Sequence, residues 1–251
     1  MADRKTCWIT DLGVQAYGPA CVLQRRLVEA RKAGAIPDVL VLCEHPHTIT
    51  LGRNGKREHL RVGEGALAAR NVEFHETDRG GDITYHGPGQ IVGYPILDLT
   101  EHRRDVRWYV QQLEDVMIRA AVDYGVAAKR VPGQHGAWVK TPAGEEKLGA
   151  LGVHLSRWVA SHGFAFNVST DLGYFDLIVP CGIPGKRATS LERLLGRTVA
   201  CAEVRERLSA HFGEIFERDM EQVSLRGLED AESFHADKEK VVAAVQELAQ
   251  Y

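Results

Sequence analysis

The spacing of apolar residues along the chain predicts three amphipathic helices. Residues 16–32 carry apolar side chains at helical spacing, and Gly34 with Pro37 supplies the stop signal beyond them. Similar stripes cover residues 106–121 and 204–215. These helices are too few and too far apart to alternate regularly with the strands of a doubly wound sheet.

Short runs rich in β-branched and aromatic residues predict many strands between the helices. They lie at residues 6–11, 39–43, 48–51, 72–77, 91–99, 137–140, 147–155 and 159–168. A turn at 141–144 joins two of them as a hairpin. Clustered strands with a few packed helices indicate an α+β fold.

The C-terminal part of the chain has a weaker pattern. Thr189-Ser190-Leu191-Glu192 matches a capping box and predicts a short helix. From residue 218 onward the sequence is more polar, with a weak helical pattern at 238–249. We therefore expect one domain over residues 1–217 and a C-terminal appendage over residues 218–251.

Composition agrees with a soluble globular protein. The 251 residues are 44% hydrophobic and 26% charged, enough for a core without disulfide or metal staples. A net charge of −3 supplies no overall field for nucleic acid or an anionic membrane. Five widely spaced cysteines argue against a disulfide framework, and no apolar run approaches the ~20 residues of a membrane span. We expect a cytoplasmic protein.

A glycine-rich segment at residues 79–90 is the first candidate for chemistry. Its glycines let the backbone approach a ligand, while Arg79, Thr84, Tyr85 and His86 offer hydrogen-bonding groups at fixed offsets. The segment matches neither a phosphate loop nor a dinucleotide-binding fingerprint. A tight hairpin with a surface arginine and histidine is the alternative interpretation.

Cys181 is the candidate nucleophile. It lies between Pro180 and Gly182 on irregular backbone, and the short predicted helix that follows has an N-terminus that would favour a thiolate. The alternative is a small, buried, unreactive cysteine.

Lys147 is the candidate base. On a strand it would share a face with Gly149 and Leu151, which leaves space for an apolar ligand beside the lysine stem. A nearby ammonium favours a thiolate, and a deprotonated lysine accepts protons. The spacing of the two residues permits a Cys–Lys pair but does not establish one, and a solvated edge lysine remains the alternative.

Two further groups of residues are open to simpler interpretations. Histidines and Cys43 concentrate in the N-terminal half, but their spacing matches no metal-binding motif, so no metal is expected. Three basic clusters are typical of solvated faces: Arg25-Arg26, Arg53 with Lys56 and Arg57, and Arg103-Arg104 with Arg107. They become functional only with an acidic partner.

Together these segments resemble the octanoyltransferases (lipoyltransferases) of lipoate biosynthesis. The resemblance runs from about residue 8 to residue 215. It rests on residues 79–90 with Tyr94, 147–153, Pro180-Cys181-Gly182, 44–46, 50–53 and 162–167. Small departures are Gly149, where the family often has alanine or another small residue, and His47 after Glu44-His45-Pro46.

The resemblance implies a mixed sheet flanked by helices, as in the catalytic domains of biotin and lipoate protein ligases. It also implies transfer of an octanoyl group from octanoyl-acyl carrier protein to Cys181 as a thioester. The acceptor would then be a lysine of a lipoyl domain of a 2-oxoacid dehydrogenase or of the glycine-cleavage H protein. Lys147 would activate Cys181 and deprotonate the incoming amine, and no cofactor is expected.

The resemblance further implies a set of acyl-substrate contacts. They are Arg79, Gly80, Gly81, Asp82, Ile83, Thr84, Tyr85, His86, Ala150, Leu151, Gly152, Gly163, Phe164 and Ala165. Three alternatives stay open: an ATP-dependent lipoate or biotin protein ligase, an amidotransferase that moves octanoyl between lipoyl domains, and a noncatalytic ligand-binding or metal-binding module.

Overall fold

The chain is built around a mixed nine-stranded sheet. A computed structural model describes residues 4–179 and 186–224. Across the sheet the strands are β12 (Arg218–Gln222), β1 (Lys5–Val14), β2 (Asp38–Glu44), β6 (Gln90–Ile96), β10 (Val159–Asn167), β9 (Gly144–Ser156), β8 (Gln134–Thr141) and β7 (Ala128–Val131), and β11 (Arg187–Ala188) pairs with β9. β12, β1 and β2 run parallel, and the pairs from β2 to β7 are antiparallel.

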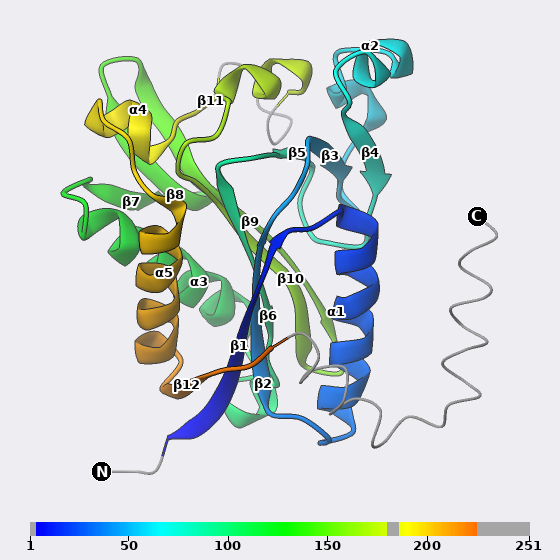
Figure 1. Cartoon of the computed structure of the whole chain (residues 1–251), viewed down its shortest axis with the longest axis vertical. Helices are drawn as coiled ribbons and strands as arrows, with labels where there is room; N and C mark the ends of the chain where they lie inside the picture. The colour runs from blue at the N-terminus through cyan, green and yellow to red at the C-terminus, as the bar shows by residue number, and fades with distance from the viewer. Residues whose placement is uncertain (1–3, 180–185, 225–251) are drawn as a thin grey trace.

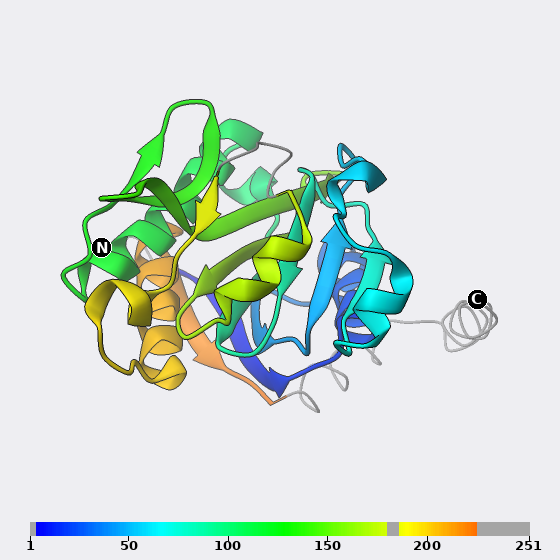
Figure 2. The ribbon, with the colours of Figure 1, turned by 90° about the horizontal axis from the view of Figure 1, so that it is seen from above.

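Helices cover both faces of this sheet, as the view from above shows (Figures 1 and 2). α1 (Tyr17–Lys32) packs on one face, and α3 (Val106–Val122) and α5 (Cys201–Ile215) pack side by side on the other. The α+β fold with a mixed sheet flanked by helices is therefore confirmed.

The central strand β2 explains why its sequence reads as an unbroken apolar run. Leu40 and Leu42 point into the core shared with α3 and α5, whereas Val39 and Val41 point into the core under α1. Because side chains alternate between faces and both faces are covered, every position needs an apolar residue.

A smaller sheet sits at one end of the molecule, at the upper right in Figure 1. Its strands are β4 (Glu73–Glu76), β3 (Thr48–Leu51) and β5 (Ile83–His86). Short helical segments complete the fold: η1 (Arg57–His59), α2 (Glu64–Ala68), η2 (Leu99–Glu101), η3 (Leu172–Leu177) and α4 (Leu191–Leu195). The small sheet has its own apolar core, which includes Ile49 and Tyr85.

The short helix expected near residue 190 is present, but its cap differs from the prediction. Ser190, not Thr189, is the N-cap residue, and its hydroxyl accepts a hydrogen bond from the backbone N–H of Arg193. The Glu192 carboxylate accepts from the N–H of Val199 instead of closing a capping box. Thr189 is held in place by its own backbone, since its N–H donates to the carbonyl of Lys147.

The domain boundary expected at residue 218 falls inside the main sheet. Residues 218–222 form β12, which pairs with β1 in parallel. Arg218 is 6% exposed, and its Nε lies 2.9 Å from the Asp38 carboxylate. Sequence polarity suggested an appendage because β12 is a short edge strand that carries mostly charged residues. Residues 225–251 lie outside the described part of the chain.

Over residues 4–179 and 186–224, no helix has the length and apolarity needed to cross a membrane.

Candidate functional site

The first part of the glycine-rich segment, residues 79–82, is a loop that lies on strand β9, whereas residues 83–86 form β5. The Gly80 N–H donates to the Val153 carbonyl at 2.9 Å. The Arg79 guanidinium, 7% exposed, donates to the carbonyls of Thr50 and Asp82 at 2.7 and 2.6 Å. The Asp82 carbonyl also accepts from the Gly52 N–H, so Arg79 adds a second hydrogen bond there and ties the loop to Thr50 of β3.

A β-bulge decides which way Lys147 points. On β8, Trp138 pairs with Lys147 and the neighbouring Ala137 pairs with Gly149, so Leu148 is the extra residue. The bulge shifts the alternation: a Cβ on Gly149 would lie 2.5 Å from the Met117 sulfur of α3, away from the cavity. Lys147 thus shares the cavity with Ala150 and not with Gly149, which corrects the expectation from simple alternation.

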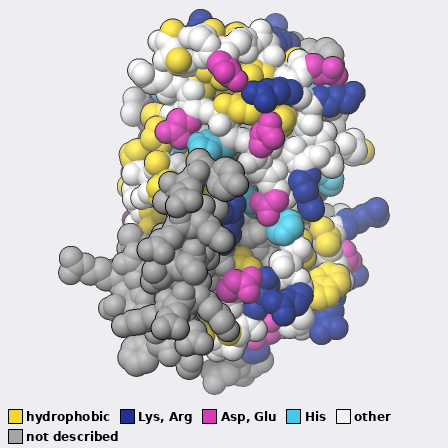
Figure 3. Space-filling model, turned by 90° about the vertical axis from the view of Figure 1, so that its right-hand side faces the viewer, with side chains coloured by type: hydrophobic (Ala, Val, Ile, Leu, Met, Phe, Trp, Pro, Cys, Tyr) yellow, Lys and Arg dark blue, Asp and Glu magenta, His cyan; other side chains and the backbone are white. Residues whose placement is uncertain are grey.

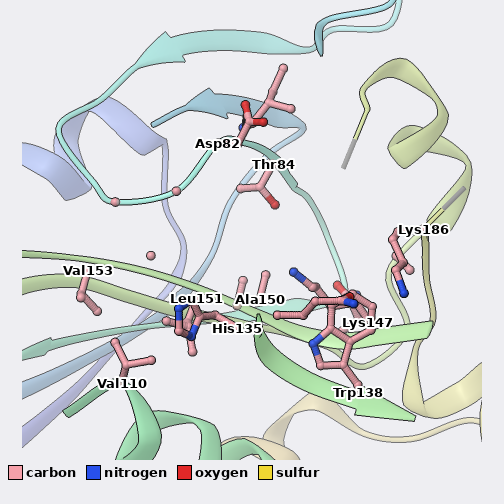
Figure 4. Close-up of a pocket in the computed structure, with 18 of the residues that line it drawn as sticks. Asp82, Thr84, Val110, His135, Trp138, Lys147, Ala150, Leu151, Val153 and Lys186 are labelled. Atoms are coloured by element: carbon pink, nitrogen blue, oxygen red, sulfur yellow. Dashed lines mark hydrogen bonds between the residues drawn. The ribbon is translucent and has the colours of Figure 1, made fainter. Parts of the chain in front are cut away.

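A pocket of about 540 Å³ lies between the glycine-rich loop and the β8–β9 hairpin. This volume is typical of small-molecule sites. Figure 4 shows Asp82 and Thr84 on one side, with Ala150 and Leu151 facing them from β9. The predicted residues that line it are Gly80, Gly81, Asp82, Ile83, Thr84, Lys147, Ala150, Leu151, Gly152 and Ala165.

A narrower recess of about 80 Å³, lined in part by the same residues, reaches deeper toward α1. Arg79, His86, Gly163 and Phe164 line it together with Tyr17, which the sequence did not single out. Burial lowers the pKa of His86 to about 3, so its imidazole is neutral at physiological pH. His86 therefore adds no charge to the lining of the recess.

Lys147 lies at the end of the pocket where cations gather. Its Nζ is 4.6 Å from the centre of the Trp138 ring, and the Nζ of Lys186 is 5.3 Å from the same ring. Figure 4 shows the two lysines approaching that ring from different segments. Two ammonium groups near one point favour an anionic nucleophile or transition state there.

Two buried amides beside this end were not among the predicted site residues. The Gln90 side chain donates to the Asn167 side-chain oxygen at 2.9 Å, and Asn167 donates to the Thr189 carbonyl at 3.0 Å. His86 lies 2.7 Å from the other end of Gln90. Both amides line the pocket, and the chain of hydrogen bonds fixes the strand that leads away from residue 186. Both residues belonged to recognised motifs, but only the tertiary structure shows that they meet.

Cys181 lies outside the described residues. The chain on either side of residues 180–185 is anchored, however. Val179 donates its N–H to the His59 carbonyl at 2.7 Å, and Ala188 pairs with Lys147 in β11–β9. Lys186 lines the same pocket as Lys147.

Tyr85 is the one predicted contact that does not line the pocket or its recess. Its ring is fully buried in the core of the small sheet, and its hydroxyl lies 2.7 Å from His47 Nδ1. Tyr174 of η3 stacks on both rings, at centroid distances of 4.1 Å from His47 and 5.1 Å from Tyr85. Tyr85 therefore anchors η3, the segment that leads toward residue 180.

Three histidines of the N-terminal half surround the Tyr17 ring, at centroid distances of 5.4 Å for His45, 5.1 Å for His75 and 6.2 Å for His86. The histidines nevertheless have separate polar partners. His45 lies 2.7 Å from the Tyr94 hydroxyl, His59 2.6 Å from Asp82 and His75 2.9 Å from Glu73. Among the residues that the structure describes, no group of three or more potential metal ligands is found.

Comparison with known proteins identifies the family. The lipoyl protein ligase A/B catalytic domain matches residues 16–213. An octanoyltransferase of Solibacter usitatus is 51% identical over 216 residues, which are 86% of this chain and 96% of the relative. One from Koribacter versatilis is 47% identical and covers 84% of this chain and 85% of its own length. The chain belongs to the octanoyltransferase family.

Solved structures show that this octanoyltransferase shares its fold with protein ligases. A bipartite lipoate protein ligase from Thermoplasma acidophilum aligns with a TM-score of 0.68 at 15% identity, over 92% of this chain and 91% of the other. A lipoate-protein ligase A bound with ATP aligns with a TM-score of 0.67 at 13% identity, over 92% and 93%. The resemblance to that fold, expected from the sequence, is confirmed.

Proposed function

We propose that this octanoyltransferase forms an octanoyl thioester on Cys181 and passes the octanoyl group to a lysine amine, with Lys147 as the proton carrier. The donor is octanoyl-acyl carrier protein, and the acceptor is a lipoyl domain of a 2-oxoacid dehydrogenase or the glycine-cleavage H protein. The observation that carries the proposal is the position of Lys147, held by the bulge at the end of a pocket whose other walls are largely uncharged.

The first step exchanges one thioester for another. The Cys181 thiolate attacks the carbonyl carbon of the donor, the new C–S bond forms, and the bond to the carrier's sulfur breaks. Lys147 in its ammonium form stabilises the Cys181 thiolate and then gives its proton to the carrier's departing thiolate, which leaves as a thiol. Because both ends are thioesters, the exchange needs no other source of energy.

The second step makes an amide. The acceptor amine attacks the Cys181 thioester, the C–N bond forms, and the C–S bond breaks. Neutral Lys147 takes the proton that the amine loses, and Cys181 leaves as a thiolate, so the starting thiolate and Lys147 ammonium are both restored. Residues of the 79–82 loop and of β9 line the pocket. Backbone N–H groups there are our candidates for stabilising the oxyanion, apart from that of Gly80, which donates to the Val153 carbonyl.

The other cysteines support this assignment of the nucleophile. The described thiols are Cys7, Cys21, Cys43 and Cys201, all free. Burial raises the pKa of each of them above its ordinary value, and none lines the pocket. A thiol with a raised pKa is a poor nucleophile at neutral pH.

The test is the mass of the intact protein after mixing with octanoyl-acyl carrier protein in the absence of ATP. We expect an octanoyl adduct that hydroxylamine removes and that Cys181→Ser abolishes. An adduct that persists in the Cys181→Ser variant would refute the assignment of Cys181 as the nucleophile. No adduct, with octanoylation of a lipoyl domain appearing only when ATP is added, would identify a ligase instead.

A further inference from the structure

The pocket of about 540 Å³ contains most of the residues expected to contact the acyl substrate, and we call it the acyl pocket. A second hollow, of about 490 Å³, opens beside it and is bordered by cationic side chains. Arg61, Lys186, Arg187 and Arg193 line it, and Asp176 is the one carboxylate among the described residues of its lining. We call this group the basic hollow. Lys186, Arg187 and Arg193 come from one short stretch of the chain, and the fold brings the distant Arg61 to join them.

The charge of the basic hollow opposes that of the whole protein. Four cations against one carboxylate in its lining contrast with a net charge of −3 for the chain. Arg193 has a nearby carboxylate, since its Nη2 lies 3.6 Å from Glu146, yet its side chain stays 51% exposed. The arginines at 61 and 187 are also exposed. Exposed like charges repel one another, and an anion relieves that repulsion.

The basic hollow continues directly from the acyl pocket. Lys186, Arg187, Ala188 and Phe175 line both cavities. Lys186 stands at the junction, over the same Trp138 ring as Lys147 (Figure 4). A molecule with its thioester beside Lys147 can therefore extend from the apolar pocket into the basic hollow without leaving the surface.

The other basic clusters of the sequence lack these properties. On the α1 face, Arg25 and Lys32 share their groove with Glu29, Glu76 and Asp78. Figure 3 shows basic and acidic side chains interspersed over the part of this face that is not covered by grey atoms. Such a mixture produces no field of a single sign.

The arginines at the start of α3 are no better placed. Arg103 pairs with Asp105 at 3.2 Å, and neither Arg103 nor Arg104 lines the acyl pocket or the basic hollow.

We propose that the basic hollow binds the anionic groups of the acyl donor, a carrier protein that presents its acyl chain on a phosphodiester-linked arm. This inference rests on the proposed function, because it takes Lys147 as the place where the thioester reacts. The anionic oxygens are those of the arm's phosphodiester, of acidic side chains on the carrier, or of both. Attraction of this kind raises the rate of encounter and orients the donor, and salt weakens it.

The experiment measures kcat/KM for acylation of the enzyme with three donors. Octanoyl-carrier protein has both kinds of anion, octanoyl-phosphopantetheine has only the phosphate, and octanoyl-pantetheine has neither. The variant is Arg61→Glu/Arg187→Glu. The control is Arg103→Glu/Arg104→Glu, which makes the same change of net charge at two exposed arginines.

We expect the ratio of kcat/KM for the carrier protein to that for octanoyl-pantetheine to fall about tenfold or more in the variant and to stay unchanged in the control. The salt dependence of the carrier reaction should weaken in parallel. If kcat/KM for octanoyl-phosphopantetheine falls as much as that for the carrier protein, the phosphate group of the arm is the anion recognised. If kcat/KM falls only for the carrier protein, the acidic side chains of the carrier are the anions recognised.

An unchanged ratio, or an equal fall in the control, would overturn the proposal. If the double glutamate variant fails to fold, the milder variant Arg61→Gln/Arg187→Gln replaces it, and the same ratio of kcat/KM values is measured. Its melting temperature, compared with that of the native chain, shows that it is folded. Failure of the proposed function gives a different result, since the native chain would then form no acyl adduct with any of the three donors.

Discussion

At the scale of single residues, Lys147 tests the mechanism most directly. Its ammonium group lies in the pocket beside Trp138, and removing it withdraws the positive charge that would favour a Cys181 thiolate. We predict that Lys147→Ala slows alkylation of Cys181 near pH 7 about tenfold, as followed by peptide mass spectrometry.

Lys140→Ala is the matched control for this measurement. Lys140 lies on the same hairpin but is exposed and outside the pocket. An alkylation rate that is the same in Lys147→Ala and in the native chain would contradict thiolate activation by Lys147.

His86 makes the stability of the protein depend on pH. Its folded-state pKa of about 3 lies below the ordinary value of 6.5 because the ring is desolvated. Between these values the unfolded chain binds a proton that the folded chain does not, so stability falls as pH falls. Each such group contributes a slope of about 1.4 kcal/mol per pH unit.

We therefore predict that His86→Gln reduces this slope between about pH 4 and pH 6 by about that amount. Urea unfolding at a series of pH values measures it. The ring centre of His45, whose pKa burial also lowers, lies 5.9 Å from that of His86, so His45→Gln alone and combined with His86→Gln separates the two contributions. Identical slopes in variant and native chain would show that His86 does not titrate in this way.

At the scale of elements, the approach of the 79–82 loop to β9 depends on Gly152. A Cβ there would lie 2.5 Å from the Gly80 carbonyl oxygen, which is backbone and cannot turn aside. We predict that Gly152→Ala pushes the loop away and lowers kcat/KM for octanoyl transfer about tenfold, equivalent to about 1.4 kcal/mol.

Gly65→Ala provides the control for this element. Gly65 lies in α2, where a Cβ would meet nothing within 4 Å. Alanine is favoured over glycine in a helix, so this variant should keep full activity. If Gly152→Ala is as active as Gly65→Ala, the close approach of loop and strand is not required.

At the scale of the whole molecule, one buried ion network joins the two ends of the described chain. Asp38 on β2 accepts from Arg31 of α1 and from Arg218 of β12, each at 2.9 Å. Burial alone would raise the pKa of Asp38, but hydrogen bonds from His102 and the Asp98 N–H and the two arginines lower it to about 2. The carboxylate therefore stays ionised and holds β12 to the sheet.

We predict that Arg218→Ala lowers the free energy of unfolding by about 3 kcal/mol, because it leaves a buried carboxylate with fewer partners. Arg207→Ala removes an exposed arginine whose nearest carboxylate oxygen is 3.9 Å away, and should cost less than about 1 kcal/mol. Denaturant unfolding of both variants measures the difference. Equal losses would mean that β12 is a loosely attached strand.

Much of the fold and of the site was already present in local sequence patterns. Apolar spacing located α1, α3 and α5 and most strands of the main sheet, because such periodicity directly records which face of an element is buried. The motifs around residues 79–86, 150–152 and 163–165 indicated the walls of the pocket, with Tyr85 as the exception. The capping residue was wrong because Glu192 binds the N–H of Val199 and not that of the expected N-cap residue. The domain boundary at 218 was wrong because β12 pairs with β1, far along the chain.

The sequence by itself thus determined the elements, the α+β class and the residue types available for acyl transfer. Only the tertiary structure decided which of them meet. The bulge at Leu148 arises from the pairing of β9 with β8, and it brings Lys147 into the pocket lining together with Ala150. Arg61 and Arg193 gather in one hollow although 132 positions separate them. Side-chain direction and long-range charge clustering depend on strand pairing, which no local pattern of residues specifies.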